Sequence, residues 1–282
     1  MTVPSGALRV ADYDVEFDIV FPVLHGPQGE DGTLQGLFET CDLPYVGCGV
    51  LPSALAMDKD LAKRVIASAG IATTPWLPVQ RSEWAGGSDV VMAEIAKKLG
   101  YPVFVKPSAQ GSSIGVRRVE SEDEVRAAID DALRYDPKVV VEEAVEGREI
   151  EVAVLDGPQA SLPGEVITAA EFYTYDAKYA DTGSRFEVPA QISEAATIEV
   201  RELAEDVFRE LGLSGLARID FFYETSTETF LFNEANTLPG FTSISGFPKM
   251  WVASGMTYAE LCSHLVDAAF RHYEERNRLA IR

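Results

Sequence analysis

Cysteine and histidine are scarce, with three of each in 282 residues. Cys41, Cys48 and Cys262 form no Cys-x-x-Cys pair and no cysteine and histidine spacing of the kind that binds zinc. We therefore expect reduced, buried cysteines. A chain of this length can bury its own core, so a small fold that depends on disulfides is excluded.

Long apolar runs and basic residues are scarce as well. No uninterrupted run approaches the roughly 18 apolar residues that span a bilayer, and Asp12, Asp14, Glu16 and Asp18 stand where a secretory leader would be basic and then apolar. Lys plus Arg number 24 against 45 Asp plus Glu, a formal net charge of −21. Such a surface repels nucleic acid and anionic lipid. We expect a cytoplasmic protein that binds neither nucleic acid nor a membrane and meets anionic ligands with a few local cations.

Hydrophobic residues make up 46% of the chain, which is typical of a globular protein of about two compact units. The apolar periodicity predicts a mixed α and β chain. Strands are expected at 17–24, 44–48, 101–106, 116–119, 139–143, 150–155, 164–169, 216–223 and 229–234, and helices at 34–41, 58–69, 89–99, 121–134, 194–211 and 257–275.

A lysine ends the predicted buried strand at 101–106, and a Gly/Ser turn at 108–115 follows it. The Lys106 ammonium and several backbone N–H groups can face one anion there, so the stretch is a candidate triphosphate cradle. It is neither a Walker A loop nor a dinucleotide crossover. The alternative is an ordinary hairpin whose lysine merely ends a strand.

Arg218 and Asp220 lie on one predicted strand, and Glu234 and Asn236 end the next. Because side chains alternate along strands, one hairpin can direct two carboxylates and an amide to one spot. Magnesium prefers such oxygen ligands, and a divalent cation removes the cost of two neighbouring carboxylates. The alternative is a solvated hairpin in which Arg218 pairs with Asp220 or Glu234.

The predicted strand at 139–143 and the extended segment after it offer an apolar slot for adenine, with Glu149 placed for a ribose hydroxyl. An inner sheet strand with a charged end is the alternative. Together, the phosphate cradle and the magnesium site point to ATP chemistry.

Seven motifs occur in order over nearly the whole chain: HGPQGEDG (25–32), MDKDLAK (57–63), VFVKPSAQGSSIGV (103–116), VVVEEAVEGREIEVAV (139–154), FYTYDAKY (172–179), RIDFF (218–222) and NEANTLPGFTSIS (233–245). In this combination the sequence resembles the D-alanine:D-alanine ligases, ATP-grasp enzymes of peptidoglycan precursor synthesis. The resemblance implies an ATP-grasp fold with a truncated N-terminal α/β domain at 1–56, a small lobe at 57–146, and a large lobe at 147–282 with the metal and substrate sites.

The resemblance also implies roles for individual residues. Nucleotide-binding roles fall to Lys59, Lys106, Ser112, Ser113, Glu142, Glu143, Val145, Glu149, Phe172, Lys178 and Phe222. Asp220, Glu234 and Asn236 are the implied ligands of two Mg²⁺ ions, for which Mn²⁺ can substitute. Arg218, Ser112, Tyr179 and the backbone of Gly240 are the implied catalytic groups. His25, Ser245 and Gly246 are the implied substrate residues.

The implied reaction joins two D-alanine molecules through an acyl phosphate made from ATP, under a closing loop at 173–184. A tyrosine at position 179 goes with D-alanine, not D-lactate, as the second substrate. Relatives are commonly dimers, so a homodimer is the expected assembly. Other carboxylate-amine ligation and a non-catalytic nucleotide-binding paralogue are the alternatives.

Three departures from the family pattern stand out. The family's N-terminal strand and glycine-rich turn have no match in 1–16, so either the true start lies upstream or activity is lost. Glu143 stands where a lysine often helps hold adenine. Gly246 stands where a larger apolar residue is usual, which alters the wall of the carboxylate pocket.

Overall fold

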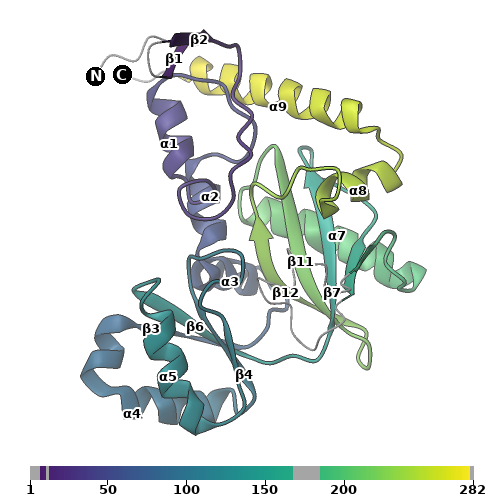
Figure 1. Ribbon diagram of the computed structural model, residues 1–282. Coiled ribbons are helices and arrows are strands. Elements are labelled where there is room, and N and C mark those ends of the chain that lie inside the picture. The colour runs from purple at the N-terminus through teal and green to yellow at the C-terminus, as the bar shows by residue number, and fades with distance from the viewer. Residues whose placement is uncertain (1–6, 11–12, 168–184, 280–282) are drawn as a thin grey trace.

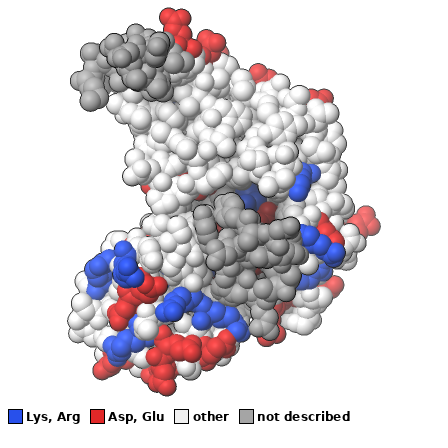
Figure 2. Space-filling view, viewed as in Figure 1, with Lys and Arg blue, Asp and Glu red and all other residues white. Residues whose placement is uncertain are grey.

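The computed structural model describes residues 7–10, 13–167 and 185–279. Figure 1 shows an N-terminal part, a small lobe built on one sheet, and a large lobe built on another. None of the described helices is long and apolar enough to cross a membrane. On the face in Figure 2, charged side chains of both signs gather over the small lobe, and the upper part is mostly uncharged. No broad basic surface is visible among the described residues of this face.

The N-terminal part contains the hairpin β1 (Ala7–Val10) and β2 (Tyr13–Glu16), followed by α1 (Thr33–Thr40) and α2 (Val50–Met57). The strands expected at 17–24 and 44–48 are wrong: only one isolated parallel bridge, Val20 to Tyr45, joins these segments. Val23 and Leu24 are about half exposed, so their apolar run is not a buried strand. Helix α2 was not predicted because it is short and has Pro52 in its first turn, where proline is tolerated.

The small lobe is a four-stranded antiparallel sheet in the order β3-β6-β4-β5. Its elements are β3 (Trp76–Gln80), α4 (Arg81–Lys98), β4 (Val103–Pro107), β5 (Arg117–Val119), α5 (Glu122–Ala132) and β6 (Lys138–Glu143). Valines of β4 and β6 pack against α4 and α5. Helix α4 has a kink at Gly87 (φ −178°, ψ 61°), and the predicted helix at 89–99 matches the part after the kink. The part before it, which begins with a capping box of Gln80 and Glu83, was not predicted.

The large lobe is a six-stranded antiparallel sheet in the order β10-β9-β7-β11-β12, with β8 paired to β7. Its elements are β7 (Arg148–Leu155), β8 (Gln159–Ala160), β9 (Gly164–Ile167), β10 (Arg185–Glu187), α7 (Glu194–Glu210), β11 (Leu216–Glu224), β12 (Thr229–Asn236), α8 (Gly246–Ala253) and α9 (Tyr258–Arg278). Val200 and Val207 of α7 pack on one face of the sheet, while side chains of α8 and α9 pack on the other. Alternating side chains of the central strands therefore serve two cores.

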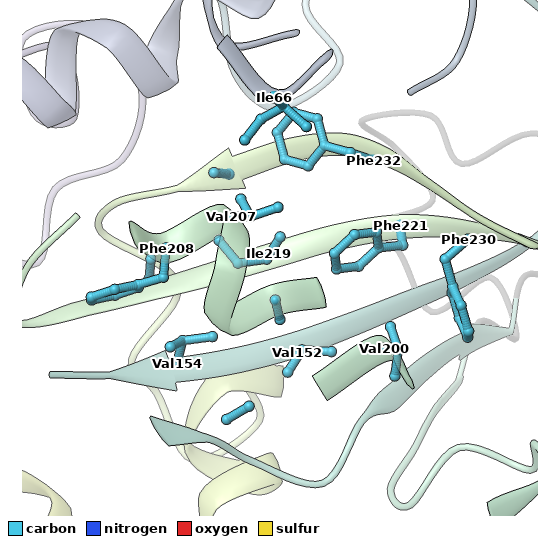
Figure 3. Close-up of a cluster of buried hydrophobic side chains, with 14 of the residues drawn as sticks. Ile66, Val152, Val154, Val200, Val207, Phe208, Ile219, Phe221, Phe230 and Phe232 are labelled. Carbon is cyan, nitrogen blue, oxygen red and sulfur yellow. The ribbon is translucent and has the colours of Figure 1, made fainter. Parts of the chain in front are cut away.

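Helix α3 (Lys59–Ser68) comes directly before the small lobe in the sequence, yet its apolar face packs against the core of the large lobe. Ala62 and Ile66 are fully buried in the core that contains Phe232 of β12, and Figure 3 shows Ile66 beside this phenylalanine. The proposed boundary at residue 57 assigns α3 to the small lobe, whereas its packing joins it to the large one. This arrangement fixes the helix against one lobe and lets its polar side chains reach the other.

Candidate active site

Two cavities adjoin between the lobes. One has a volume of about 450 Å³ and extends along β6, β7, β11 and the loop after β4. The other, of about 650 Å³, lies between the 25–30 turn and the loop that follows β12. Both are lined by Lys59, Gln110, Gly111, Ser112, Glu151, Val166, Arg218 and Glu234. A molecule bound in one can therefore reach a molecule bound in the other.

The hairpin of β11 and β12 forms the floor where the cavities meet. Asp220 lies directly opposite Glu234, and Arg218 lies opposite Asn236. The Arg218 guanidinium donates to both carboxylate oxygens of Asp220, at 2.8 and 2.7 Å, and its Nε lies 3.4 Å from Glu151 Oε2. Burial would lower the pKa of Arg218, but Asp220 and Glu151 outweigh it and hold the pKa well above its usual value. The arginine is a permanent cation at the junction.

The oxygen atoms of this hairpin suit a hard divalent cation. Carboxylates directly opposite one another on neighbouring strands repel, and a bound cation relieves that repulsion. Asn236 donates to Asp220 Oδ2 at 2.9 Å, so its amide lies beside the same carboxylate. Among the described residues, no group of three or more His, Cys, Asp or Glu side chains could hold a metal ion. The donor set is therefore two carboxylates and an amide, which fits magnesium with water and phosphate as further ligands.

The N-terminus of α3 delivers a second cation to the junction. Asp58 caps the helix by accepting from Leu61 N, and the Lys59 backbone N–H donates to Ser108 O at 3.0 Å. Lys59 Nζ then donates to Gln110 O at 2.8 Å and lies 3.5 Å from Glu234 Oε2. Lys59 thus lies between the loop after β4 and the hairpin of the large lobe.

The loop after β4 carries backbone geometry that is rare for residues with side chains. Ser112 and Ser113 have φ values of 54° and 58°, and Gly115 has a φ of 70°. A Cβ at Gly115 would lie 2.8 Å from the Tyr135 ring, so only glycine fits there. Left-handed residues in succession turn the loop tightly, a conformation that exposes backbone N–H groups to an anion.

The predicted nucleotide residues that the structure describes line the 450 Å³ cavity: Lys59, Lys106, Ser112, Ser113, Glu142, Glu143, Val145, Glu149 and Phe222. Glu143 is exposed, whereas Glu142 is buried, with 2% exposure. Glu142 Oε2 forms an ion pair with Lys106 Nζ at 2.6 Å. Burial would raise the pKa of Glu142, but Lys106 and Lys63 outweigh it and hold the pKa below its usual value. Glu142 therefore stays ionised beside the cavity.

The predicted substrate residues line the second cavity. His25 is exposed, and its Nδ1 lies 2.8 Å from Leu238 O. Ser245 precedes α8, and its Oγ accepts from Thr242 N at 3.0 Å. A Cβ at Gly246 would lie 2.9 Å from both Phe186 Cζ and Glu151 Oε2, so a larger residue would not fit without movement. Gly240 lines the same cavity.

Three of the predicted residues, Phe172, Lys178 and Tyr179, lie outside the described residues, as does the 173–184 loop. Asp220 lines the first cavity and Asn236 the second, so the implied metal ligands fall on both sides of the junction.

Sequence reasoning missed several buried or partly buried polar residues near the site. Glu30 accepts from Gly26 N at 2.6 Å and from Leu238 N at 3.3 Å, which fixes the 25–30 turn against the large lobe. Lys138 forms ion pairs with Asp58 and Asp60 beneath the loop after β4. Lys63 is fully buried. Its position on the apolar stripe of α3, three residues before Ile66, is the signal that was available in the sequence.

Comparison with known proteins identifies the family. A family model described as the C-terminus of D-ala D-ala ligase matches residues 65–267, and the model of its N-terminus matches residues 4–48. A D-alanine--D-alanine ligase of Heliobacterium modesticaldum is 49% identical over 268 residues, which are 94% of this chain and 73% of that protein. One from Acetivibrio thermocellus is 48% identical over 92% of this chain and 70% of that protein.

Solved structures agree. The D-alanine-D-alanine ligase from Coxiella burnetii superposes with a TM-score of 0.83 at 38% identity, covering 94% of this chain and 71% of that one. The VanG D-Ala:D-Ser ligase from Enterococcus faecalis has a TM-score of 0.81 at 39% identity, covering 93% and 74%. The predicted fold is confirmed by these neighbours. By sequence and by structure, the chain belongs to the D-alanine–D-alanine ligase family.

Proposed function

We propose that this chain joins two D-alanine molecules to D-alanyl-D-alanine at the expense of ATP, for peptidoglycan precursor synthesis. Family membership supports this activity. The proposed roles of individual residues are supported mainly by one observation: Arg218, Lys59 and Glu234 line both cavities where these meet. A triphosphate in the first cavity and a carboxylate in the second would meet at these three side chains.

In the first step, a carboxylate oxygen of one D-alanine attacks the γ-phosphorus of ATP. The bond from that phosphorus to the bridging oxygen breaks, and ADP leaves. Lys59 and Lys106 line the nucleotide cavity near the loop after β4, so their ammonium groups are placed to offset charge on the phosphates. Positioning and charge stabilisation are the chain's contributions to this step.

In the second step, the amine of the other D-alanine attacks the acyl carbon. The bond from that carbon to the phosphate oxygen breaks, phosphate leaves, and the amine loses a proton. Arg218 lines both cavities, which supports the proposal that its fixed charge stabilises the negative charge that would develop on the carbonyl oxygen. The Gly240 backbone lines the second cavity and is proposed as a further donor to this oxygen.

Asp220, Glu234 and Asn236 are proposed to hold two Mg²⁺ ions, or Mn²⁺ in their place. Bound there, the metal would supply charge compensation for the nucleotide phosphates. Ser112 and Ser113 are proposed to contact the phosphates, and Ser245 and Gly246 the carboxylate of the second substrate. Lys178, Tyr179 and Phe172 keep their predicted roles as proposals, as do the homodimer and the cytoplasmic location.

Release of ADP and of dipeptide tests this function. Purified protein with ATP, Mg²⁺ and D-alanine should release one ADP for each D-alanyl-D-alanine detected by mass spectrometry. L-alanine should not replace D-alanine, and D-lactate or D-serine as the second substrate should react more slowly. A faster reaction with another carboxylate and amine would identify a different ligase. ADP binding without any ADP release would identify a non-catalytic paralogue.

A further inference from the structure

Lys63 of α3 has an ionisable side chain that is fully buried, with 0% exposure. Among the described residues it is the largest of the fully buried side chains. Its Nζ lies 3.4 Å from Glu142 Oε1, donates to Thr74 Oγ1 through a short hydrogen bond, and lies 3.5 Å from Phe232 O. A buried ammonium is costly unless it is paired. Lys63 ends the MDKDLAK motif (57–63), but the resemblance implies no role for it and the proposed mechanism gives it none.

The partner of Lys63 links it to the nucleotide cavity. Glu142 Oε2 pairs with Lys106 Nζ at 2.6 Å, and Oε1 faces Lys63. Oε1 accepts no hydrogen bond from a described residue and forms an ion pair with Lys63. The carboxylate is thus shared by two lysines, of which Lys106 lines the cavity and Lys63 does not. Without Lys63, the Glu142 carboxylate would pair with Lys106 alone.

The two lysines reach Glu142 from different parts of the molecule. Lys106 and Glu142 belong to paired strands of the small lobe. Lys63 belongs to α3, whose Ala62 and Ile66 are buried in the core of the large lobe. The ion pair of Lys63 with Glu142 therefore joins the two lobes beneath the nucleotide cavity.

We propose that Lys63 is a positioning residue for nucleotide binding: by neutralising Glu142 from the opposite side, it leaves the Lys106 ammonium available to the phosphates of ATP. The inference rests on the proposed nucleotide site but not on the identity of the amino-acid substrates. Without the Lys63 charge, Glu142 would hold Lys106 more tightly, and phosphates would compete for that lysine with a buried carboxylate.

The test measures affinity for ADP with Mg²⁺ by calorimetry, which needs no ligation. Lys63→Met, of similar length and without charge, should weaken ADP binding by about tenfold, the effect of one charged contact. In steady-state ADP release, KM for ATP should rise by a similar factor while kcat changes less. Arg64→Met is the matched control, because Arg64 is the next residue of α3, is 57% exposed and pairs only with Asp60 in the described chain.

A double-substitution cycle keeps the inference testable if Lys63→Met does not fold. Replacing both members of a buried pair avoids an unpaired buried charge, so Lys63→Met/Glu142→Gln should fold. If Lys63 acts through Glu142, this double variant should bind ADP within about twofold of Glu142→Gln alone. A several-fold weaker affinity than Glu142→Gln would overturn the inference, as would unchanged affinity in a folded Lys63→Met.

The outcomes separate this inference from the proposed function. Wild-type protein that binds ADP and Mg²⁺ but makes no dipeptide would contradict the proposed ligation. The comparison of ADP affinities among the Lys63 and Glu142 variants would still test the positioning role. Wild-type protein that makes dipeptide while the cycle shows no coupling between Lys63 and Glu142 overturns only the positioning role.

Discussion

Asp58 Oδ1 accepts a hydrogen bond from Ser108 Oγ at 2.8 Å, which joins the N-terminus of α3 to the start of the loop after β4. The same carboxylate caps α3 and pairs with Lys138 Nζ at 2.6 Å. One side chain therefore fixes the helix that carries Lys59 and the loop that carries Ser112 in a single arrangement. The phosphate-binding residues proposed above depend on that arrangement.

Asp58→Ala should consequently impair both stability and nucleotide binding. Loss of a cap and of a half-buried ion pair should lower the free energy of unfolding by roughly 2 to 4 kcal/mol. KM for ATP should rise because the loop is no longer fixed to α3. Ser193→Ala is the control, since Ser193 caps α7 by accepting from Ala196 N and does not line either cavity. It should cost about 1 kcal/mol and leave KM unchanged. Equal effects of the two variants on KM would contradict this account.

The pairing of His272 with Asp156 predicts a pH-dependent contribution to stability. His272 Nε2 lies 3.0 Å from Asp156 Oδ2, which attaches α9 to the turn after β7. The hydrogen bond with Asp156 outweighs burial and raises the pKa of His272. The stabilisation is therefore fully present below the ordinary histidine pKa of about 6.5 and is lost as pH rises through the raised value.

Chemical denaturation between about pH 5.5 and about pH 9 measures this effect, because Asp156 stays ionised throughout that range. The difference in unfolding free energy between wild type and His272→Gln should shrink as pH rises. In an Asp156→Asn background, the advantage of the protein that keeps His272 over the His272→Gln variant should no longer shrink as pH rises, because the main cause of the raised pKa is gone. A wild-type advantage that grows with pH would contradict the assignment of a protonated His272 to the folded state.

Local sequence signals predicted most of the fold. Alternating valines located β4, a continuous run of three valines located β6, and apolar stripes located α3, α5, α7 and α9. The failed strand at 17–24 shows the limit of this reasoning. Val23 and Leu24 are about half exposed, and Ile19 and Phe21 pack against the core formed by β7, α8 and α9 without pairing with a strand. Only Val20 finds a bridge partner, at Tyr45. Composition alone did not reveal that no sheet would pair with it.

Part of the candidate site could also be predicted. Alternation along the two strands predicted that one hairpin could direct Asp220 and Glu234 to one spot, and the register of β11 with β12 puts them opposite each other. The buried partners were not accessible in this way. Lys63 meets Glu142 across 79 residues of sequence, and Asp58 meets Ser108 across 50. Such contacts depend on how α3 packs against one lobe while facing the other, which no local pattern encodes.

Gly246 offers a test of the second cavity. A Cβ there would lie 2.9 Å from Phe186 Cζ and from Glu151 Oε2, and a Cβ at Gly164 would lie 2.2 Å from the same ring. Gly246→Ala should therefore displace Phe186 or Glu151. The reaction uses two D-alanine molecules, each with its own KM, and the larger of these two values should rise by about tenfold. KM for ATP should change little.

Dipeptide formation as a function of D-alanine concentration measures this effect. Gly36→Ala is a suitable control, because no heavy atom lies within 4 Å of a Cβ at that position of α1. Gly246→Ala/Phe186→Leu should recover much of the lost affinity by making room for the new methyl group. Failure of the double variant to recover would mean that Phe186 does not limit the space at residue 246.

Glu234→Gln tests the proposed metal site most directly. The substitution keeps the size of the side chain but removes the charge that faces Asp220 on the neighbouring strand. If Glu234 holds magnesium, ADP release should fall by about a hundredfold or more, and the Mg²⁺ concentration for half-maximal rate should rise. The free energy of unfolding should change by no more than about 1 kcal/mol, because the ion pair of Glu234 with Lys59 is lost while the repulsion from Asp220 is relieved. Glu224→Gln, on the same hairpin but away from both cavities, should leave the rate and the Mg²⁺ dependence unchanged. A Glu234→Gln variant with a normal rate and a normal Mg²⁺ dependence would show that the hairpin is an ordinary ion-paired surface of the sheet.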